Sequence, residues 1–338
     1  MNWKQLISAK RFGMEEFHEE RQENRSEFQR DYDRLIFSAP FRRLQNKTQV
    51  FPLPGSVFVH NRLTHSLEVA SVGRSLGDDV AKALLERHPE LQDSFLPEIG
   101  SIVSAACLAH DLGNPPFGHS GEKAISTFFS EGKGVRLKEK QPNGEQLSPM
   151  EWEDLTHFEG NANAFRILTH QFEGRRKGGF VLTYTTLASI VKYPFSSSLA
   201  GKKSKFGFFV SEEESYRKIA TELGLIQLSE QPLKYARHPL VYLVEAADDI
   251  CYQMMDIEDA HKLKIITTDE TKELLMAFFS EDRQSRLRST FQIVNDINEQ
   301  IAYLRSSVIG LLVRECTRVF LEHEQEILAG TFEGALIK

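Results

Sequence analysis

The sequence is poor in cysteine and has no long apolar run. Its 338 residues include three cysteines, Cys107, Cys251 and Cys316, an odd number without CxxC spacing. This usage favours reduced thiols in a cytosol over a disulfide framework. No apolar run approaches the roughly 20 residues needed to span a bilayer, and the first residues do not form a signal peptide. These absences predict a cytoplasmic protein with no membrane partner.

Basic residues are outnumbered by acidic ones. The chain has 41 Lys and Arg against 48 Asp and Glu, a net charge of -7, which argues against nucleic acid as the main substrate. Two local basic groups, at 175–177 and 202–205, could still contact phosphate. A solvated surface explains each of them alone better than a phosphate site does.

Helical periodicity dominates the chain, with no internal repeat. We expect a short helix or turn within 31–45, helices over 63–85 and 183–191, and amphipathic helices over 269–328 on the outside or between subunits. Pro and Gly interrupt the helical pattern at 52–55, so 56–60 could form a short hairpin strand, and 132–149 is expected to be an exposed loop or small hairpin.

The adjacent pair His110-Asp111 is the first candidate metal-binding feature. The apolar segment 104–109 predicts a helix that ends at this pair, with Gly113 as its C-terminal stop. Adjacent helical side chains point about 100° apart, so the two could share one ion only if other helices supply further ligands. A buried histidine is more often an ordinary hydrogen-bonded core residue, so the pair needs partners.

His65 and Asp248 are the available partners. His65 flanks the apolar stripe of the helix expected over 63–85, and Asp248 recurs with Tyr252 and Asp256 every four residues, which places these three on one helical face. Two imidazoles and two carboxylates leave positions open for water and a phosphate oxygen. Such a set suits Mn²⁺ or Mg²⁺, and also Fe²⁺, Co²⁺, Ni²⁺ or Zn²⁺. A structural ion closed by four protein ligands is the alternative.

A second polar pair, His119 and Glu122, follows in the next segment. If a helix starts at Ser120, Glu122 lies in its first turn and can reach back to His119. A carboxylate bonded to an imidazole fixes the ring and favours its protonated form, which suits a proton donor or shuttle. The alternative is that Glu122 merely caps the helix.

The metal-binding set and its surroundings resemble the HD phosphohydrolase superfamily, and within it the bacterial deoxyguanosine triphosphate triphosphohydrolases. The resemblance runs in order from about Arg30 to about Ala260 through the segments 113–122, 157–161, 192–194, 205–209 and 245–250. It implies an all-α HD-domain fold with a short β-hairpin and irregular loops. Because the ligands run from 65 to 248, we expect residues 1–338 to form a single domain. Its metal-binding core would cover about 30–262 and its C-terminal helical region about 263–338, shorter than in family members.

The resemblance also assigns roles to residues. It makes His119 and Glu122 the catalytic pair, and His65, His110, Asp111 and Asp248 the metal ligands. It implies that Gln49 contacts the deoxyribose, that Arg62 contacts the triphosphate, and that Tyr252 and Asp256 close around the sugar. Further phosphate or sugar contacts are expected from Asn161, Lys192, Tyr193 and Lys205. An ordinary salt bridge or core hydrogen bond would explain any one of these substrate contacts equally well.

The predicted function is hydrolysis of a deoxynucleoside triphosphate, dGTP first, to the deoxynucleoside and inorganic triphosphate. A homo-oligomer is expected, with single-stranded DNA or a dNTP as candidate effectors. One alternative is an HD phosphohydrolase acting on another nucleotide, such as a monophosphate or guanosine tetraphosphate. Another is a nucleotide-sensing or single-stranded nucleic-acid-binding protein with little turnover, although such a protein would not require His119 and Glu122 beside a metal.

Overall fold

The computed structural model describes residues 1–16, 25–49, 59–140, 142, 144–175, 177–201 and 204–337. The α-helices are α1 (Trp3–Leu6), α2 (Glu27–Ile36), α3 (Ala39–Arg43), α4 (Arg62–Arg87), α5 (Ile99–Ala109), α6 (His119–Ser130), α7 (Pro149–Thr156), α8 (Gly160–Thr169), α9 (Tyr184–Ile190), α10 (Glu213–Glu222), α11 (Val241–Lys262), α12 (Thr268–Met276), α13 (Glu281–Phe291), α14 (Ile297–Glu322) and α15 (Glu324–Ala329). Short 3-10 helices are η1 (Leu44–Asn46), η2 (Pro89–Leu91), η3 (Leu96–Glu98), η4 (Lys133–Lys138), η5 (Ser197–Leu199) and η7 (Val210–Glu212). Strands β1 (Gln227–Ser229) and β2 (Lys234–Tyr235) form an antiparallel pair.

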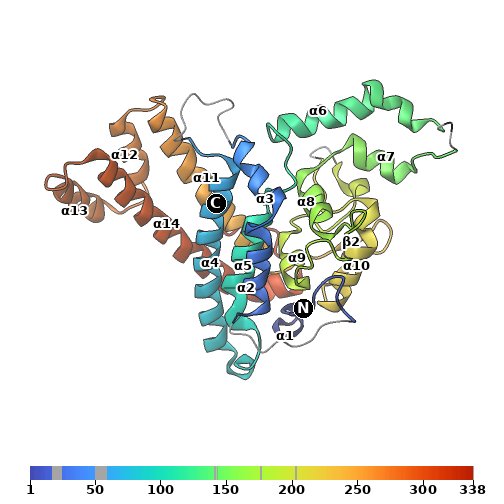
Figure 1. The fold of residues 1–338 in the computed structure, drawn as a ribbon. Coiled ribbons are helices and arrows are strands. Elements are labelled where there is room, and N and C mark those ends of the chain that lie inside the picture. The colour runs from blue at the N-terminus through green and yellow to red at the C-terminus, as the bar shows by residue number, and fades with distance from the viewer. Residues whose placement is uncertain are drawn as a thin grey trace.

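Three helices, α4, α5 and α11, pack together at the centre of the molecule (Figure 1). Every residue of α5 is buried, as its almost wholly apolar sequence requires. Glycines let α4 approach α5 closely, since a Cβ on Gly77 would lie 2.6 Å from the Cα of Gly100 and one on Gly73 would lie 2.6 Å from the sulfur of Cys107. The close approach of α4 and α5 therefore depends on glycine at both positions.

The start of α4 is determined locally by its sequence. The Asn61 side chain accepts the N–H groups of Leu63 and Thr64, both at 3.0 Å, and the Thr64 hydroxyl accepts the N–H of Asn61 in return. This reciprocal capping box fixes the first helical turn. Arg62 and His65 consequently leave the helix at its N-terminal end.

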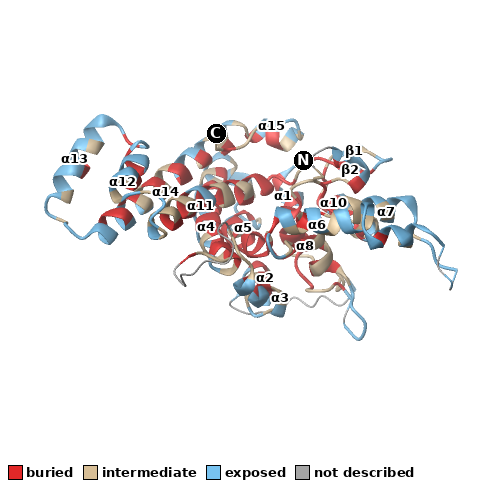
Figure 2. Ribbon diagram, turned by 90° about the horizontal axis from the view of Figure 1, so that it is seen from above, coloured by how far each residue is buried: buried red, intermediate tan, exposed pale blue. Residues whose placement is uncertain are grey.

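Two helical arms extend from this centre. Helices α12 and α13 project on one side and are joined to the core by the long helix α14, whereas α6 and α7 lie on the other side (Figure 1). Figure 2 shows that both arms are mostly exposed. Among the described helices, none combines the length and apolar composition that crossing a bilayer requires.

The helical pattern predicted from the sequence is confirmed: α4 covers the predicted 63–85, α9 lies within the predicted 183–191, and α12 to α15 lie between 268 and 329. The hairpin strand expected at 56–60 lies mostly outside the described residues, and Val59 and His60, which are described, are not in a strand. The described part of 132–149 contains η4 and irregular loop without a hairpin. The observed strands instead follow α10, where the sequence analysis predicted none.

Candidate metal centre and catalytic pocket

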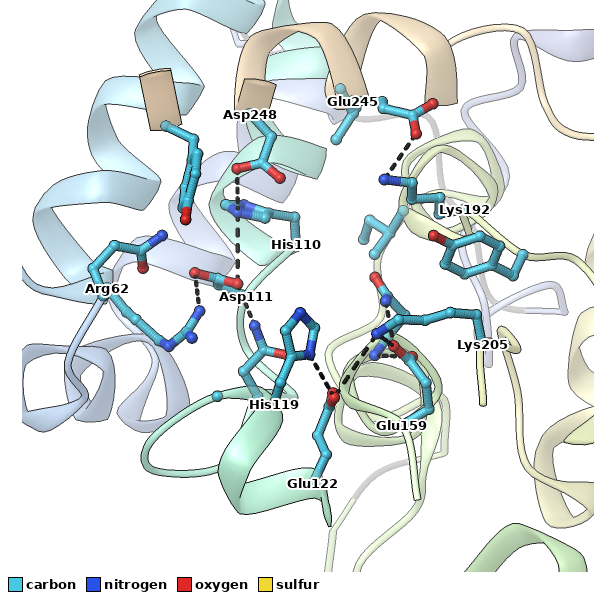
Figure 3. Close-up of a pocket in the computed structure, with 18 of the residues that line it drawn as sticks. Arg62, His110, Asp111, His119, Glu122, Glu159, Lys192, Lys205, Glu245 and Asp248 are labelled. Atoms are coloured by element: carbon cyan, nitrogen blue, oxygen red, sulfur yellow. Dashed lines mark hydrogen bonds and ion pairs between the residues drawn. The ribbon is translucent and has the colours of Figure 1, made fainter. Parts of the chain in front are cut away.

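A cavity of about 520 Å³ opens between the central helices and the segment that carries α6 and α8 (Figure 3). Most residues predicted for the site line it, namely Gln49, Arg62, His110, Asp111, His119, Glu122, Asn161, Lys192, Tyr193, Lys205, Asp248 and Tyr252. His65 is fully buried beside it, and Asp256 is not among its lining residues. The fold thus gathers residues from 49 to 252 around one space.

Four side chains form a cluster at one side of this cavity, which we call the ligand cluster: His65, His110, Asp111 and Asp248. Ligand atoms of the first three all lie within 4.8 Å of one another. One oxygen of Asp248 lies 2.9 Å from His65 Nε2 and 3.5 Å from His110 Nε2. Helices α4 and α11 and the end of α5 therefore bring His65, His110 and Asp111 close enough to share one cation, with Asp248 beside the two imidazoles.

The charges in the ligand cluster perturb one another strongly. Burial disfavours protonated His110, but Asp111 and Asp248 outweigh it and raise the pKa of His110 to about 9. Burial would raise the pKa values of both carboxyl groups, but His110 and other cationic groups nearby hold them below the usual range. This field favours anionic carboxylates beside cationic partners, and a divalent ion could replace the imidazole proton.

The hydrogen bonds of the histidines orient their free nitrogens. His110 Nδ1 lies 2.6 Å from the carbonyl of Cys107, and His65 Nδ1 lies 3.1 Å from the sulfur of Met255. Donation through Nδ1 leaves each Nε2 facing the cluster, as in metal-bound histidine. The buried Nε2 of His110 has no hydrogen-bond partner in the described part of the chain.

His238 shows what a structural histidine looks like in the same fold. It is fully buried, donates from Nε2 to the carbonyl of Leu6 and accepts the N–H of Leu240 at Nδ1. Burial lowers its pKa to about 4, so the ring is neutral. Both of its nitrogens are satisfied by backbone, and no acidic side chain contributes to its titration.

His119 and Glu122 are joined as predicted. Phe117 and Gly118 have positive φ angles of 65° and 52°, and this turn starts α6 at His119. Glu122 Oε2 lies 2.8 Å from His119 Nδ1, and Glu122 Oε1 accepts the N–H of Gly160 at 2.8 Å. The carboxylate is therefore fixed from two sides, while the imidazole is 85% exposed toward the cavity.

The cationic residues predicted to contact phosphate are held by carboxylates. Arg62 Nη1 donates to Asp111 at 2.7 Å. Opposite the ligand cluster lies a group that we call the lysine wall: Lys192 and Lys205 with their partners Glu245 and Glu159. Lys192 Nζ is 2.7 Å from Glu245, and Lys205 Nζ is 2.7 Å from Glu159 (Figure 3).

Several functional neighbours are missing from the sequence prediction. Glu159 and Glu245 belong to the quoted segments 157–161 and 245–250 but were given no role, and Met255 lies seven residues after Asp248. The available signal was their position beside predicted site residues. The pairing of each carboxylate with one particular lysine depends on tertiary structure.

The predicted sugar contacts lie at the rim. Tyr252 is 45% exposed and lines the cavity one helical turn after Asp248. Burial raises its pKa, and the nearby Asp256 carboxylate raises it further. Gln49 lines the cavity from the segment before α4, and its buried side-chain oxygen has no partner among the described residues. The two thus offer a ring and an amide to a guest.

A backbone contact connects the two halves of the pocket. A Cβ added to Gly113 would lie 2.0 Å from the carbonyl oxygen of Gly160 and 2.2 Å from the nitrogen of Ala164. Gly113 follows the His110-Asp111 pair, and Gly160 donates to Glu122. The ligand cluster and the His119–Glu122 pair are therefore linked through this contact.

Comparisons with known proteins show the family of the chain. The sequence profile of the HD domain matches residues 62–228. The chain is 42% identical to a deoxyguanosinetriphosphate triphosphohydrolase-like protein of Synechocystis sp., in an alignment covering the whole chain and 76% of that protein. A protein of the same description from Pseudomonas aeruginosa is 42% identical, with 74% of its length covered. A deoxyguanosinetriphosphate triphosphohydrolase of Yersinia enterocolitica is 33% identical, with 73% covered.

Proposed function

The chain belongs to the HD-domain family of deoxyguanosinetriphosphate triphosphohydrolases and their relatives. From this premise we propose that it hydrolyses a deoxynucleoside triphosphate to the deoxynucleoside and inorganic triphosphate, with dGTP as the main candidate substrate. The observation that carries the proposal is that three residues lining one cavity each have a buried polar atom without a hydrogen-bond partner in the described residues, namely His110 Nε2, Arg62 Nε and Gln49 Oε1. Buried polar groups are normally satisfied, so the set indicates a bound guest.

The ligand cluster fits a divalent cation. His65, His110, Asp111 and Asp248 would hold it, and the mixed nitrogen and oxygen donors suit Mn²⁺ or Mg²⁺ without excluding other divalent ions. When bound, such an ion polarises a phosphoryl oxygen and offsets the negative charge that develops at phosphorus. The Nε2 of His110 supports this assignment, because it faces carboxylate oxygens of Asp248 and Asp111 at 3.5 and 3.7 Å without forming a hydrogen bond to any described residue.

The protein groups around the cluster would bind and orient the substrate. Arg62, Lys192 and Lys205 supply positive charge for the triphosphate, and the arginine can form two parallel bonds to one phosphate. Tyr252 would lie against the deoxyribose, together with Gln49. Asn161, Tyr193 and Asp256 remain candidate contacts.

Proton transfer is assigned to His119. Water adds to the α-phosphorus, and the bond between that phosphorus and the 5′-oxygen breaks. Protonated His119, held by Glu122, donates a proton to the leaving 5′-oxygen, and the water proton is lost to solvent. General acid catalysis of this kind contributes on the order of 10² to 10⁴ in rate.

The test is product analysis. The protein is incubated with each of the four dNTPs and with GTP, with Mn²⁺, Mg²⁺ or another divalent ion, and the products are separated by chromatography. Inorganic triphosphate and deoxynucleoside are expected. Orthophosphate would mean attack elsewhere on the chain of phosphates. DNA binding by the metal-free protein without hydrolysis of any nucleotide would favour the sensing alternative.

We also propose a cytoplasmic homo-oligomer. The free, buried cysteines agree with a reducing compartment. On the α12–α14 arm, Leu274, Ile293 and Tyr303 are exposed apolar residues that a second subunit could cover. Light scattering at several protein concentrations tests the oligomer.

A further inference from the structure

Glu159 is a buried carboxylate at the edge of the cavity whose two oxygens have different partners. It is 1% exposed. Oε2 accepts the backbone N–H groups of Asn161 at 2.5 Å and Ala162 at 3.3 Å, which caps α8. Oε1 accepts hydrogen bonds from Asn161 Nδ2 at 2.8 Å and Lys205 Nζ at 2.7 Å. A helix cap needs only the backbone bonds, so the second oxygen serves another purpose.

The ammonium group of Lys205 lies between two carboxylates. It is 2.7 Å from Glu159 Oε1 and 3.8 Å from Glu122 Oε2. That oxygen of Glu122 is also the one bonded to His119 Nδ1. Lysine carries a compact charge on a flexible stem, so its position depends on which anion holds it. Figure 3 shows the row from His119 through Glu122 and Lys205 to Glu159.

The charges of Glu159 and Lys205 depend on each other. Burial lowers the pKa of Lys205, but Glu159 raises it, with smaller contributions from Glu122 and Tyr193, so the net shift is upward. Burial raises the pKa of Glu159, and Lys205 opposes that shift. Removing one partner of a buried ion pair leaves the other charge uncompensated. Lys205 would then move toward the remaining carboxylate.

We propose that Glu159 is a positioning residue that holds Lys205 at ion-pair distance from Glu122 and keeps it from forming a direct hydrogen bond to Glu122 Oε2, so that this oxygen stays hydrogen-bonded to His119. Without the charge of Glu159, Glu122 is the carboxylate within 3.8 Å of the Lys205 ammonium. A charge-assisted bond to Glu122 is stronger than one to a neutral amide. Lys205 would then compete with His119 for the same oxygen. The inference rests on the proposed function, in which His119 is the proton donor.

The test is a double-mutant cycle. Glu159→Gln keeps the length of the side chain and an oxygen that can cap α8, but it removes the charge. We expect kcat to fall about 10-fold, a partial loss of general acid catalysis, with KM changed less than about 2-fold. In the background of Lys205→Met no lysine can move onto Glu122. There Glu159→Gln should change kcat less than about 2-fold.

A matched cap distinguishes positioning from folding. Asp296 caps α14 by accepting the N–H of Glu299 at 2.9 Å and does not line the cavity. Asp296→Asn should leave kcat unchanged. If Glu159→Gln lowered kcat equally with and without Lys205, its role would be the helix cap alone and the proposal would be wrong. An unchanged kcat for Glu159→Gln in the parent protein would also overturn it.

A readout without turnover separates this inference from the proposed function. The ¹⁵N NMR signals of the His119 ring, assigned by comparison with His119→Ala, should move in Glu159→Gln. They should stay in place when the same change is made in Lys205→Met. If the parent protein hydrolyses no dNTP but the NMR cycle behaves in this way, the proposed function fails and the positioning role stands. Equal movement in both backgrounds, or none in the parent, contradicts the positioning role.

Discussion

The ligand cluster and the lysine wall face each other across one cavity, but their polar groups are satisfied to different degrees. In the ligand cluster, the buried Nε2 of His110 has no hydrogen-bond partner in the described residues. In the lysine wall, Lys192 and Lys205 each have a carboxylate at 2.7 Å. The ligand cluster thus has a ring nitrogen available to bind a cation. The lysines of the lysine wall, in contrast, must exchange their carboxylate partners for phosphate when they bind a substrate. Substitutions in the ligand cluster should therefore abolish turnover, whereas substitutions elsewhere should only reduce it.

The largest effect is expected from removing a ligand of the cluster. Asp248→Ala should lose the metal and abolish turnover, because an anionic donor to the cation is gone, and Asp111→Ala should do the same. Helix content should persist, since α5 and its neighbours are held by apolar packing. Elemental analysis and circular dichroism check these outcomes. Asp249→Ala, which alters the adjacent carboxylate outside the cavity lining, is the control. Full metal occupancy in both variants would contradict the ligand assignment.

A smaller effect on turnover is expected from a substitution of His119, which lies between the ligand cluster and the lysine wall. His119→Ala should lower kcat by about 10² to 10⁴ while metal content stays normal, because the ring donates a proton and does not belong to the ligand cluster. Steady-state kinetics and elemental analysis measure the two quantities. His170→Ala serves as the control, since that histidine lies outside the cavity lining. Near-normal turnover in His119→Ala would contradict the catalytic role of His119.

At the rim, the expected effect is on selectivity. A 2′-hydroxyl against Tyr252 would lose its water without gaining a partner, which costs about 1 to 3 kcal/mol, or about 5- to 150-fold. We expect preference for dGTP over GTP by at least that factor, and Tyr252→Ala should reduce it as overall activity falls. The ratio of kcat/KM values is the measurement. Phe37→Ala, at an exposed aromatic residue just after α2 and outside the cavity lining, should leave the ratio unchanged. Equal use of both nucleotides by the parent would defeat the sugar assignment.

The smallest effect is expected for His60, which lies outside both the ligand cluster and the lysine wall. His60 lies 2.8 Å from Asp259 and 3.2 Å from Glu68, and these carboxylates raise its pKa from 6.5 to about 9. Its stabilising contribution is therefore complete below pH 6.5 and is lost as the pH rises through about 9. His60→Gln should lower the free energy of unfolding by about 1 to 2 kcal/mol at pH 6 and by much less at pH 9.5.

Urea unfolding at these two pH values measures the difference. His170→Gln provides the comparison, because the ring of His170 contacts neither Asp259 nor Glu68. A loss of stability in His60→Gln that did not depend on pH would show that His60 stabilises the fold through packing alone. It would leave the comparison between the ligand cluster and the lysine wall unaffected.

The sequence predicted those parts of the protein that depend on local pattern. Apolar periodicity located α4 and α9, and the four-residue spacing of Asp248, Tyr252 and Asp256 indicated the helix that is α11. The order of residues also placed Glu122 in the first turn of α6, where it reaches His119. Each of these features depends on neighbours within a few residues.

The remaining features depend on contacts between distant segments. Lys205 reaches Glu159 across 46 residues, and His65 reaches Met255 across 190. Periodicity carries no record of such pairs. The strands at 227–229 and 234–235 are only three and two residues long, too short for an alternating pattern to reveal. The family resemblance supplied the roles of single residues, but not their partners in the unliganded pocket.

The contact between Gly113 and Gly160 bears on how such an enzyme could be redesigned. A methyl group at Gly113 would lie 2.0 Å from the carbonyl oxygen of Gly160, and one at Gly160 would lie 2.0 Å from Oδ1 of Asn114. The spacing between the two halves of the pocket is consequently set by the backbone and cannot be changed by substituting side chains. Variation in substrate range has to come from rim positions such as 49 and 252. A mutant library aimed at new nucleotides should diversify the rim and leave both glycines untouched.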